Sequence, residues 1–165
     1  MALISFVYCK KPTEFKEIEV NNIFSIQIPT YLHPTGDLLP ITAANIHQYE
    51  DSAGKVCLMI FDTSRAGFEI SSLKTFYDSM VANPVMDSTR MLEPQLVKID
   101  KDSAFQSEIT GKHDDTKLFG EMVAIASKER FYFILTWSSL DRRDELKPDI
   151  YKMLNSFHDI SHLKK

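Results

Sequence analysis

Two groups of residues in this sequence have the types and spacing of a metal site. His158 and His162 are four residues apart, so on a helix they would share one face, as two metal ligands do. His113, Asp114 and Asp115 would place an imidazole and two carboxylates on one loop. Both groups also suit simpler roles, because helix ends fray in polar C-terminal stretches and aspartate tolerates turn geometry. Since neither group has an identifiable further ligand, we expect solvated histidines and a hairpin turn, with no metal and no cofactor.

Signatures of catalysis and of phosphate binding are absent from the sequence. The serines lie in no G-x-S-x-G elbow, and neither Cys9 nor Cys57 lies in a catalytic cysteine motif. The five glycines are too scattered to form a phosphate-cradling loop. We therefore expect no enzymatic activity, although a hydrolase site assembled from distant residues would leave no such pattern. A pocket holding a histidine or carboxyl group with a shifted pKa would favour the hydrolase.

Composition and charge exclude several classes of protein. The 165 residues include 19 lysines and arginines and 23 aspartates and glutamates, with positive and negative residues interleaved. Because no basic face is visible, nucleic acid is not an expected partner. The hydrophobic content of 44% is that of an ordinary globular chain, which is long enough here for one core. Cys57 lies within the apolar run Val56–Phe61, so we expect it to be a buried structural thiol.

The N-terminal segment has two interpretations. Residues Ala2–Tyr8 are almost wholly apolar, and the sequence becomes polar directly after Cys9. In the first interpretation the run ends a lipoprotein signal, and Cys9 is acylated and tethers the chain to a bacterial envelope membrane. Against it, the run is short, a basic n-region is missing, and Tyr8 stands where such signals have a small residue. In the second the segment is a first strand or an ordered arm, so the envelope and the cytoplasm both stay open as compartments.

Alternating and apolar runs predict a mostly antiparallel sheet of about six strands. Leu118–Ala126 and Phe131–Trp137 are largely apolar on both faces, with Glu121 as their one charged residue. Their short connection predicts an antiparallel pair that is covered on both sides. The strand-like runs are Ile18–Val20, Ile23–Ile28, Ala44–Tyr49, Lys55–Asp62, Leu92–Ile99 (weakened by Pro94), Ala104–Thr110, Leu118–Ala126 and Phe131–Trp137.

Two apolar stripes at helical spacing predict the helices that cover this sheet. The first stripe follows Ser71 or Ser72, either of which can cap a helix, and stops before Pro84. The second contains Pro148, which should kink the helix or mark a restart. The stripe residues are Leu73, Phe76, Tyr77, Met80 and Val81 in the first helix, and Leu146, Ile150, Met153, Leu154 and Phe157 in the second.

Together these elements predict an α/β protein of the α+β type, an α/β/α sandwich with helices on both faces of the central sheet. The single domain should span residues 15–158. An N-terminal arm or signal remnant would precede it at residues 1–14, and a polar C-terminal tail would follow at residues 159–165.

The segment Thr30–Thr42 is the best candidate for a partner-binding loop. Its prolines and glycine predict a loop that crosses the surface. It nevertheless carries four large apolar side chains, Tyr31, Leu32, Leu38 and Leu39. Apolar residues on such a loop either pack beneath it or meet a partner.

The order of elements and three core phrases resemble the PsbP-like superfamily, which includes PsbP of photosystem II, the Ran-binding protein Mog and the DcrB-like proteins. The phrases are Phe24–Pro29, Phe131–Trp137 and Met153–Phe157, and the resemblance spans residues 15 to 157. It implies a binding or assembly protein without a shared active site, so no functional residue is carried over. Because many bacterial relatives are exported, some as lipoproteins, it also favours acylation of Cys9.

We therefore expect a noncatalytic protein-binding or assembly module whose protein partner is unknown. Two alternatives remain open: a small-ligand carrier, which would need an apolar cavity beside Trp137, and the hydrolase.

Overall fold

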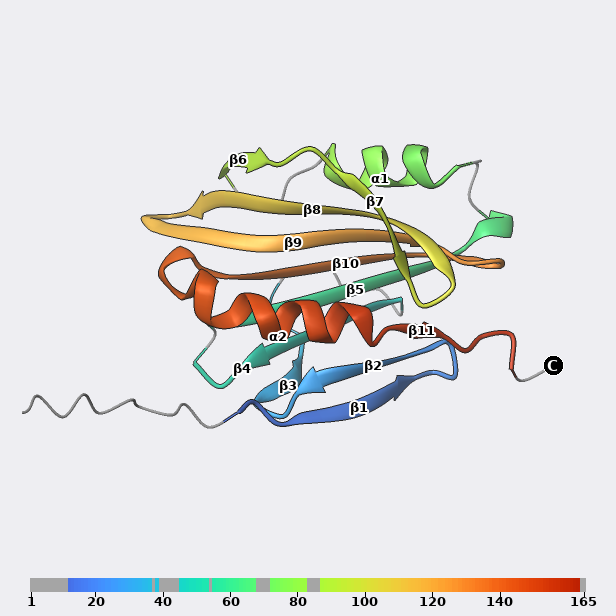
Figure 1. Cartoon of the computed structure of the whole chain (residues 1–165), viewed down its shortest axis with the longest axis horizontal. Coiled ribbons are helices and arrows are strands. Elements are labelled where there is room, and N and C mark those ends of the chain that lie inside the picture. Colours follow the sequence, from blue (N-terminus) through green and yellow to red (C-terminus); the bar gives the residue numbers. More distant parts are fainter. Residues whose placement is uncertain are drawn as a thin grey trace, which may run out of the picture.

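Strands make up most of the computed structural model, which describes residues 12–36, 38, 45–53, 55–67, 72–82 and 87–163. This part of the chain forms two antiparallel sheets and two α-helices, and Figure 1 shows how they are arranged. The strands are β1 Phe15–Val20, β2 Phe24–Pro29, β3 Leu32–Thr35, β4 Ile46–Asp51, β5 Val56–Ser64, β6 Asp87–Met91, β7 Gln95–Ile99, β8 Asp102–His113, β9 Thr116–Ala126, β10 Arg130–Ser139 and β11 His158–Asp159. The helices are α1 Leu73–Val81 and α2 Arg143–Asn155, with short 3-10 turns at Arg65–Gly67 and Leu140–Arg142.

The large sheet has eight strands in the order β3-β4-β5-β10-β9-β8-β6, and β7 pairs with β8 next to β6. It is therefore larger than the predicted sheet of about six strands. One addition is β3, which lies inside the segment predicted as a loop. The other is β6, which lies before the predicted run Leu92–Ile99; within that run only Gln95–Ile99 forms a strand, and Pro94, which lacks a backbone N–H, precedes it.

The small sheet has the order β1-β2-β11 and uses the first two predicted strands. β1 and β2 are joined by a tight turn at Asn21 and Asn22, whose φ angles are 51° and 57°. β11 pairs His158 with Ser25 and Asp159 with Phe24, and Ile160 donates its N–H to the carbonyl of Ile23. The small sheet thus includes residues that the sequence places in a polar tail.

The two helices lie on opposite faces of the large sheet, as predicted. Along β10, Tyr132 and Ile134 pack in a core with α2 and β2, whereas Phe131, Phe133 and Leu135 pack in a second core with α1. α2 lies between β10 and β2 (Figure 1). One face of the large sheet is therefore covered by α1, and the other by α2 together with the small sheet.

The ends and the continuity of the helices follow from a few residues. Ser72 caps α1, since its Oγ accepts the N–H of Thr75 at 3.1 Å, which confirms the predicted start. α2 runs through Pro148 without the predicted restart. Pro148 has no N–H to bond the carbonyl of Asp144 one turn earlier. Both residues are exposed, so water can reach that carbonyl instead. Neither helix in the described residues is long and apolar enough to cross a membrane.

Candidate binding site at the β6–β7 edge

Exposed apolar side chains gather where β6 passes into β7, at one edge of the large sheet. Met91, Leu92 and Leu96 are 40%, 61% and 67% exposed. They follow β8 along its length and occupy both faces of the edge: Met91 and Leu96 are opposite Ile109 and Phe105, which face α1, whereas Leu92 bonds the carbonyl of Glu108 and lines a pocket on the α2 side. We call Met91, Leu92 and Leu96 the edge patch.

The backbone at the edge patch is also open on one side. Both β6 and β7 pair with β8, and among the described strands neither has a partner on its outer side. Each strand has five residues, and Pro94 lies in the connection between them. Short strands and prolines are common devices that limit unwanted edge-to-edge pairing. A partner can therefore pair only with a short, defined stretch of this edge.

A pocket of about 270 Å³ lies beside the edge patch, between β7, β8 and β9 and helix α2. Leu92 contributes to its apolar wall, and this residue belongs to the edge patch as well. The polar groups come from both layers, with Glu108 and Glu121 on the sheet and Lys147 and Tyr151 on α2. We call this the edge pocket.

Glu108 is the ionised carboxylate of the edge pocket. Arg143 Nη2 lies 2.7 Å from its Oε1, and Lys147 Nζ lies 2.7 Å from its Oε2. Burial alone would raise the pKa of Glu108, but the hydrogen bonds from Arg143 and Lys147 bring it below its ordinary value. Arg143 and Lys147 of α2 are therefore both engaged by one carboxylate.

Glu121 has the opposite electrostatic setting. Its side chain lines the edge pocket although the residue is only 2% exposed. Gln106 Nε2 donates to its Oε2 at 3.2 Å, and no ion pair joins Glu121 to any residue that the structure describes. Burial raises the pKa of Glu121, and the hydrogen bond from Gln106 opposes this only in part. Glu121 therefore holds a proton to higher pH than an ordinary glutamate.

Of the predicted partner-binding loop, the structure describes residues 30–36 and 38. Leu32 is fully buried in β3, where it packs in the core with α2 and the small sheet, so it is not presented to a partner. Tyr31 and Leu38 are half-buried. Leu39 and Cys9 lie outside the described residues.

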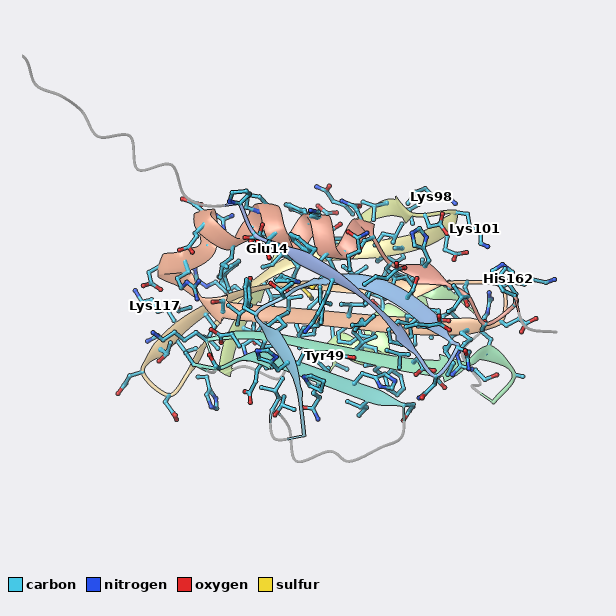
Figure 2. The ribbon with its side chains drawn as sticks, turned by 90° about the horizontal axis from the view of Figure 1, so that it is seen from below. Glu14, Tyr49, Lys98, Lys101, Lys117 and His162 are labelled. Carbon is cyan, nitrogen blue, oxygen red and sulfur yellow. The ribbon has the colours of Figure 1, made fainter. Side chains whose placement is uncertain are left out.

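His158 and His162, which on a helix would share one face, do not lie on a helix. His158 lies in β11 with its Nδ1 3.2 Å from Asp100 Oδ2, and His162 Nε2 lies 3.2 Å from Lys101 Nζ. Figure 2 shows Lys101 and His162 at one end of the molecule and Lys117, beside the β8–β9 turn, at the other. Within the described ranges, no three histidine, cysteine or acidic side chains cluster as metal ligands.

A second pocket, of about 610 Å³, lies beside Trp137 at the end of the sheet formed by the β8–β9 turn. His113 and Asp114 line it, and Asp114 has φ 51°, which confirms the predicted turn. Most of the lining side chains are polar or charged, including Lys55 and Arg142. The small-ligand carrier would need an apolar cavity beside Trp137, and a lining with so many polar side chains does not match that expectation.

Cys57 is buried at 4% exposure in β5, as predicted. Burial is the main cause that raises the pKa of its thiol to about 12. Because the thiolate is the reactive form of cysteine, this residue is chemically inert at neutral pH.

The large antiparallel sheet has one helix on one face, and a helix together with the small sheet on the other. This chain therefore has the PsbP-like class of fold. No protein-family model and no curated protein matches the sequence. The solved structures to which it is similar include cyanobacterial PsbP (CyanoP) from Synechocystis sp. PCC 6803, with a TM-score of 0.65 and 10% identity over 90% of this chain and 94% of that one. The chain therefore has the fold that its core phrases predict.

Two further solved structures have the same arrangement. The Ran-binding protein Mog1p of Saccharomyces cerevisiae matches with a TM-score of 0.61 and 12% identity, over 90% of this chain and 97% of that one. LpqN, involved in cell envelope biogenesis of Mycobacterium tuberculosis, matches with a TM-score of 0.54 and 8% identity, over 89% of this chain and 84% of that one. The TM-scores establish that the fold is shared. Identities this low do not establish a shared function, which has to be argued from the site itself.

Proposed function

We propose that this chain is a noncatalytic binding module that engages a protein partner through the edge patch. The observation that carries the proposal is the set of exposed apolar side chains Met91, Leu92 and Leu96 along one edge of the large sheet, with no further strand beside it among the described ones. Leaving Leu92 and Leu96 in water costs about 25 cal/mol for each Å² of apolar surface, a cost that a bound partner would remove.

The edge favours a partner that binds as an extended segment. Such a segment would bond the free backbone groups of β7 and place its side chains against Leu92 and Leu96, which is the β-augmentation mode of peptide recognition. Mog1p, which shares the fold, is a Ran-binding protein, so a protein-binding role has a precedent on this architecture.

The edge pocket also supplies the feature that favours a hydrolase, a buried carboxyl group whose pKa is shifted. The Ser107 hydroxyl that lines this pocket does not support a hydrolase. Ser107 Oγ donates to the carbonyl of Leu92 at 2.6 Å, so its proton is held by the backbone and not by a base. Glu108 is occupied by its two cations. The groups of this pocket are therefore suited to binding.

Replacing Leu92 and Leu96 with serine should weaken partner binding without affecting the fold, because both side chains are mostly exposed. Twelve-residue peptides would be selected from a random displayed library against the whole chain, and their affinities measured by calorimetry. We expect the double variant to bind selected peptides about 30-fold more weakly, as for the loss of two central apolar contacts.

Leu163→Ser is the matched control, since Leu163 is also 67% exposed but belongs to the C-terminal segment beside the β7–β8 turn, outside the edge patch. It should leave the affinity unchanged. Equal affinities for the double variant and the unaltered chain would contradict the proposal. A dimer of this chain, seen by light scattering and dissociated by Leu92→Ser and Leu96→Ser, would also contradict it, because the edge patch would then join two copies of this chain.

A membrane tether through Cys9 is a separate proposal, supported by the change of composition at that residue. If it holds, expression in a bacterial host from the native upstream sequence should give a membrane-associated species. Its intact mass should correspond to a chain that begins at Cys9 and carries a lipid group. A soluble species of unmodified mass that retains Met1 or Ala2 would exclude the tether and leave the binding proposal unaffected.

A further inference from the structure

We infer that the edge pocket receives a cationic group, the ammonium or guanidinium of a lysine or arginine side chain that the partner inserts beside Leu92 to pair with Glu121. This inference rests on the proposed function, because a segment bound on the edge patch is what would bring the side chain to the pocket. Leu92 belongs to both surfaces, so a residue docked against it has the pocket directly next to it.

Charge in the edge pocket favours a cation. Glu93, Glu108 and Glu121 line it together with a single cation, Lys147. Arg143 also bonds Glu108, so the five charged groups sum to one negative charge when Glu121 is ionised. Bringing in a cation neutralises that charge, whereas an anion would add to it.

Glu121 is a buried carboxyl group that forms no ion pair with any residue the structure describes. The groups that face it are Gln106 and Glu108 on β8, Lys147, Tyr151 and Arg143 on α2, and Thr136 on β10. Both cations among them are bonded to Glu108 at 2.7 Å. An ionised carboxylate buried to this degree is unfavourable without a partner charge. A cation from outside supplies that charge to a carboxyl group that is itself only 2% exposed.

Proton release should accompany binding. In the free chain Glu121 holds its proton to higher pH than usual, and the cation pairs with the ionised form. Binding should therefore lower the pKa of Glu121, and affinity should fall as the pH falls through the raised pKa of the free chain.

A small cation tests the pocket without any peptide. The probe is n-butylammonium, compared with its neutral counterpart 1-butanol, with NMR observation of the Glu121 carboxyl carbon and backbone amides. We expect butylammonium to shift the Glu121 and Gln106 signals and to bind at least tenfold more tightly than 1-butanol, as a charge-assisted hydrogen bond implies.

Glu121→Gln keeps the shape of the side chain and should weaken butylammonium binding about tenfold and abolish its pH dependence. Asp115→Asn, at an exposed carboxylate in the β8–β9 turn outside this lining, is the control and should change the affinity less than twofold. If the Glu121→Gln variant fails to fold, a pH titration of the unaltered chain with and without butylammonium still tests whether the amine lowers the pKa of Glu121. Equal binding of 1-butanol, unchanged affinity in Glu121→Gln, or a pKa of Glu121 that the amine does not lower would overturn the inference.

The two proposals fail in different ways. Selected peptides that need Leu92 and Leu96 but no lysine or arginine would overturn the cationic partner and leave the edge patch standing. Butylammonium binding at Glu121 without any peptide on the edge patch would contradict the proposed function and with it the protein source of the cation.

Discussion

Replacing Gly120 with alanine is expected to destabilise the chain by about 3 kcal/mol or more, enough to unfold a marginal domain. Gly120 lies in β9 opposite Trp137 of β10. A Cβ at Gly120 would stand 2.0 Å from the carbonyl oxygen of Thr136 and 3.3 Å from the Cα of Trp137. These are backbone atoms of a strand paired on both sides, so no side-chain rotation can relieve the contact.

Urea unfolding of Gly120→Ala and of Gly36→Ala separates this close contact from the general effect of replacing glycine. A Cβ at Gly36 would meet nothing within 4 Å, so its variant should unfold within about 0.5 kcal/mol of the unaltered chain. Similar unfolding midpoints for the two variants would show that β9 and β10 are not held as closely as the structure describes.

Replacing Asp62 with alanine should cost about 3 to 5 kcal/mol, the usual effect of removing one partner from a buried ion pair. Asp62 is 1% exposed in β5, and Arg130 Nη2 donates to its Oδ1. His47 Nε2 lies 3.4 Å from Oδ2, and the ring of His47 contacts Phe24 of the small sheet. Without Asp62, the half-buried guanidinium of Arg130 loses this counter-ion. The free energy of unfolding in urea at pH 7 measures the loss.

The same pair predicts a dependence of stability on pH. Burial alone would raise the pKa of Asp62, but His47 and Arg130 bring it below its ordinary value. The contribution of Asp62 is therefore complete above the unfolded pKa of about 4 and is lost as the pH falls through the lower pKa of the folded chain. Asp62→Asn should flatten this acid loss.

The exposed residue Asp78 provides the matched control, since its ion pair with Lys74 at 2.6 Å is more than half exposed at both side chains. Asp78→Asn should change stability by less than about 0.5 kcal/mol. If Asp62→Ala were as mild as Asp78→Asn, the Asp62 cluster would not hold β5 to its neighbours.

Periodic apolar patterns predict most of this fold. The two-sided apolar run Phe131–Trp137 became the strand that faces both cores, and the helical spacing from Leu73 gave α1. β3 was missed because Pro34 suggests a loop, yet β3 is the last strand of its sheet, where a missing N–H is tolerated. β11 has two residues, too few for any pattern.

The candidate site was predictable only in fragments. Glu121 is conspicuous in the sequence as the one charge in two apolar strands, but its partners Gln106 and Tyr151 come from β8 and α2, and sequence spacing does not bring them together. The edge patch depends on where two strands end and begin: β6 ends at Met91, before the predicted run Leu92–Ile99, and β7 begins only after Pro94. Exposure of Leu92 and Leu96 follows from these bounds and from pairing with β8, which is a property of the tertiary structure.

The most direct test of the edge patch as a binding surface is an NMR map of the isotope-labelled chain in complex with a selected peptide. We predict that the largest amide shifts fall on Leu92 and Leu96, and that outer-edge amides of β6 and β7 gain protection from hydrogen exchange. Shifts confined to the half-buried Tyr31 and Leu38, or to the pocket beside Trp137, with β6 and β7 unchanged, would contradict the proposed function.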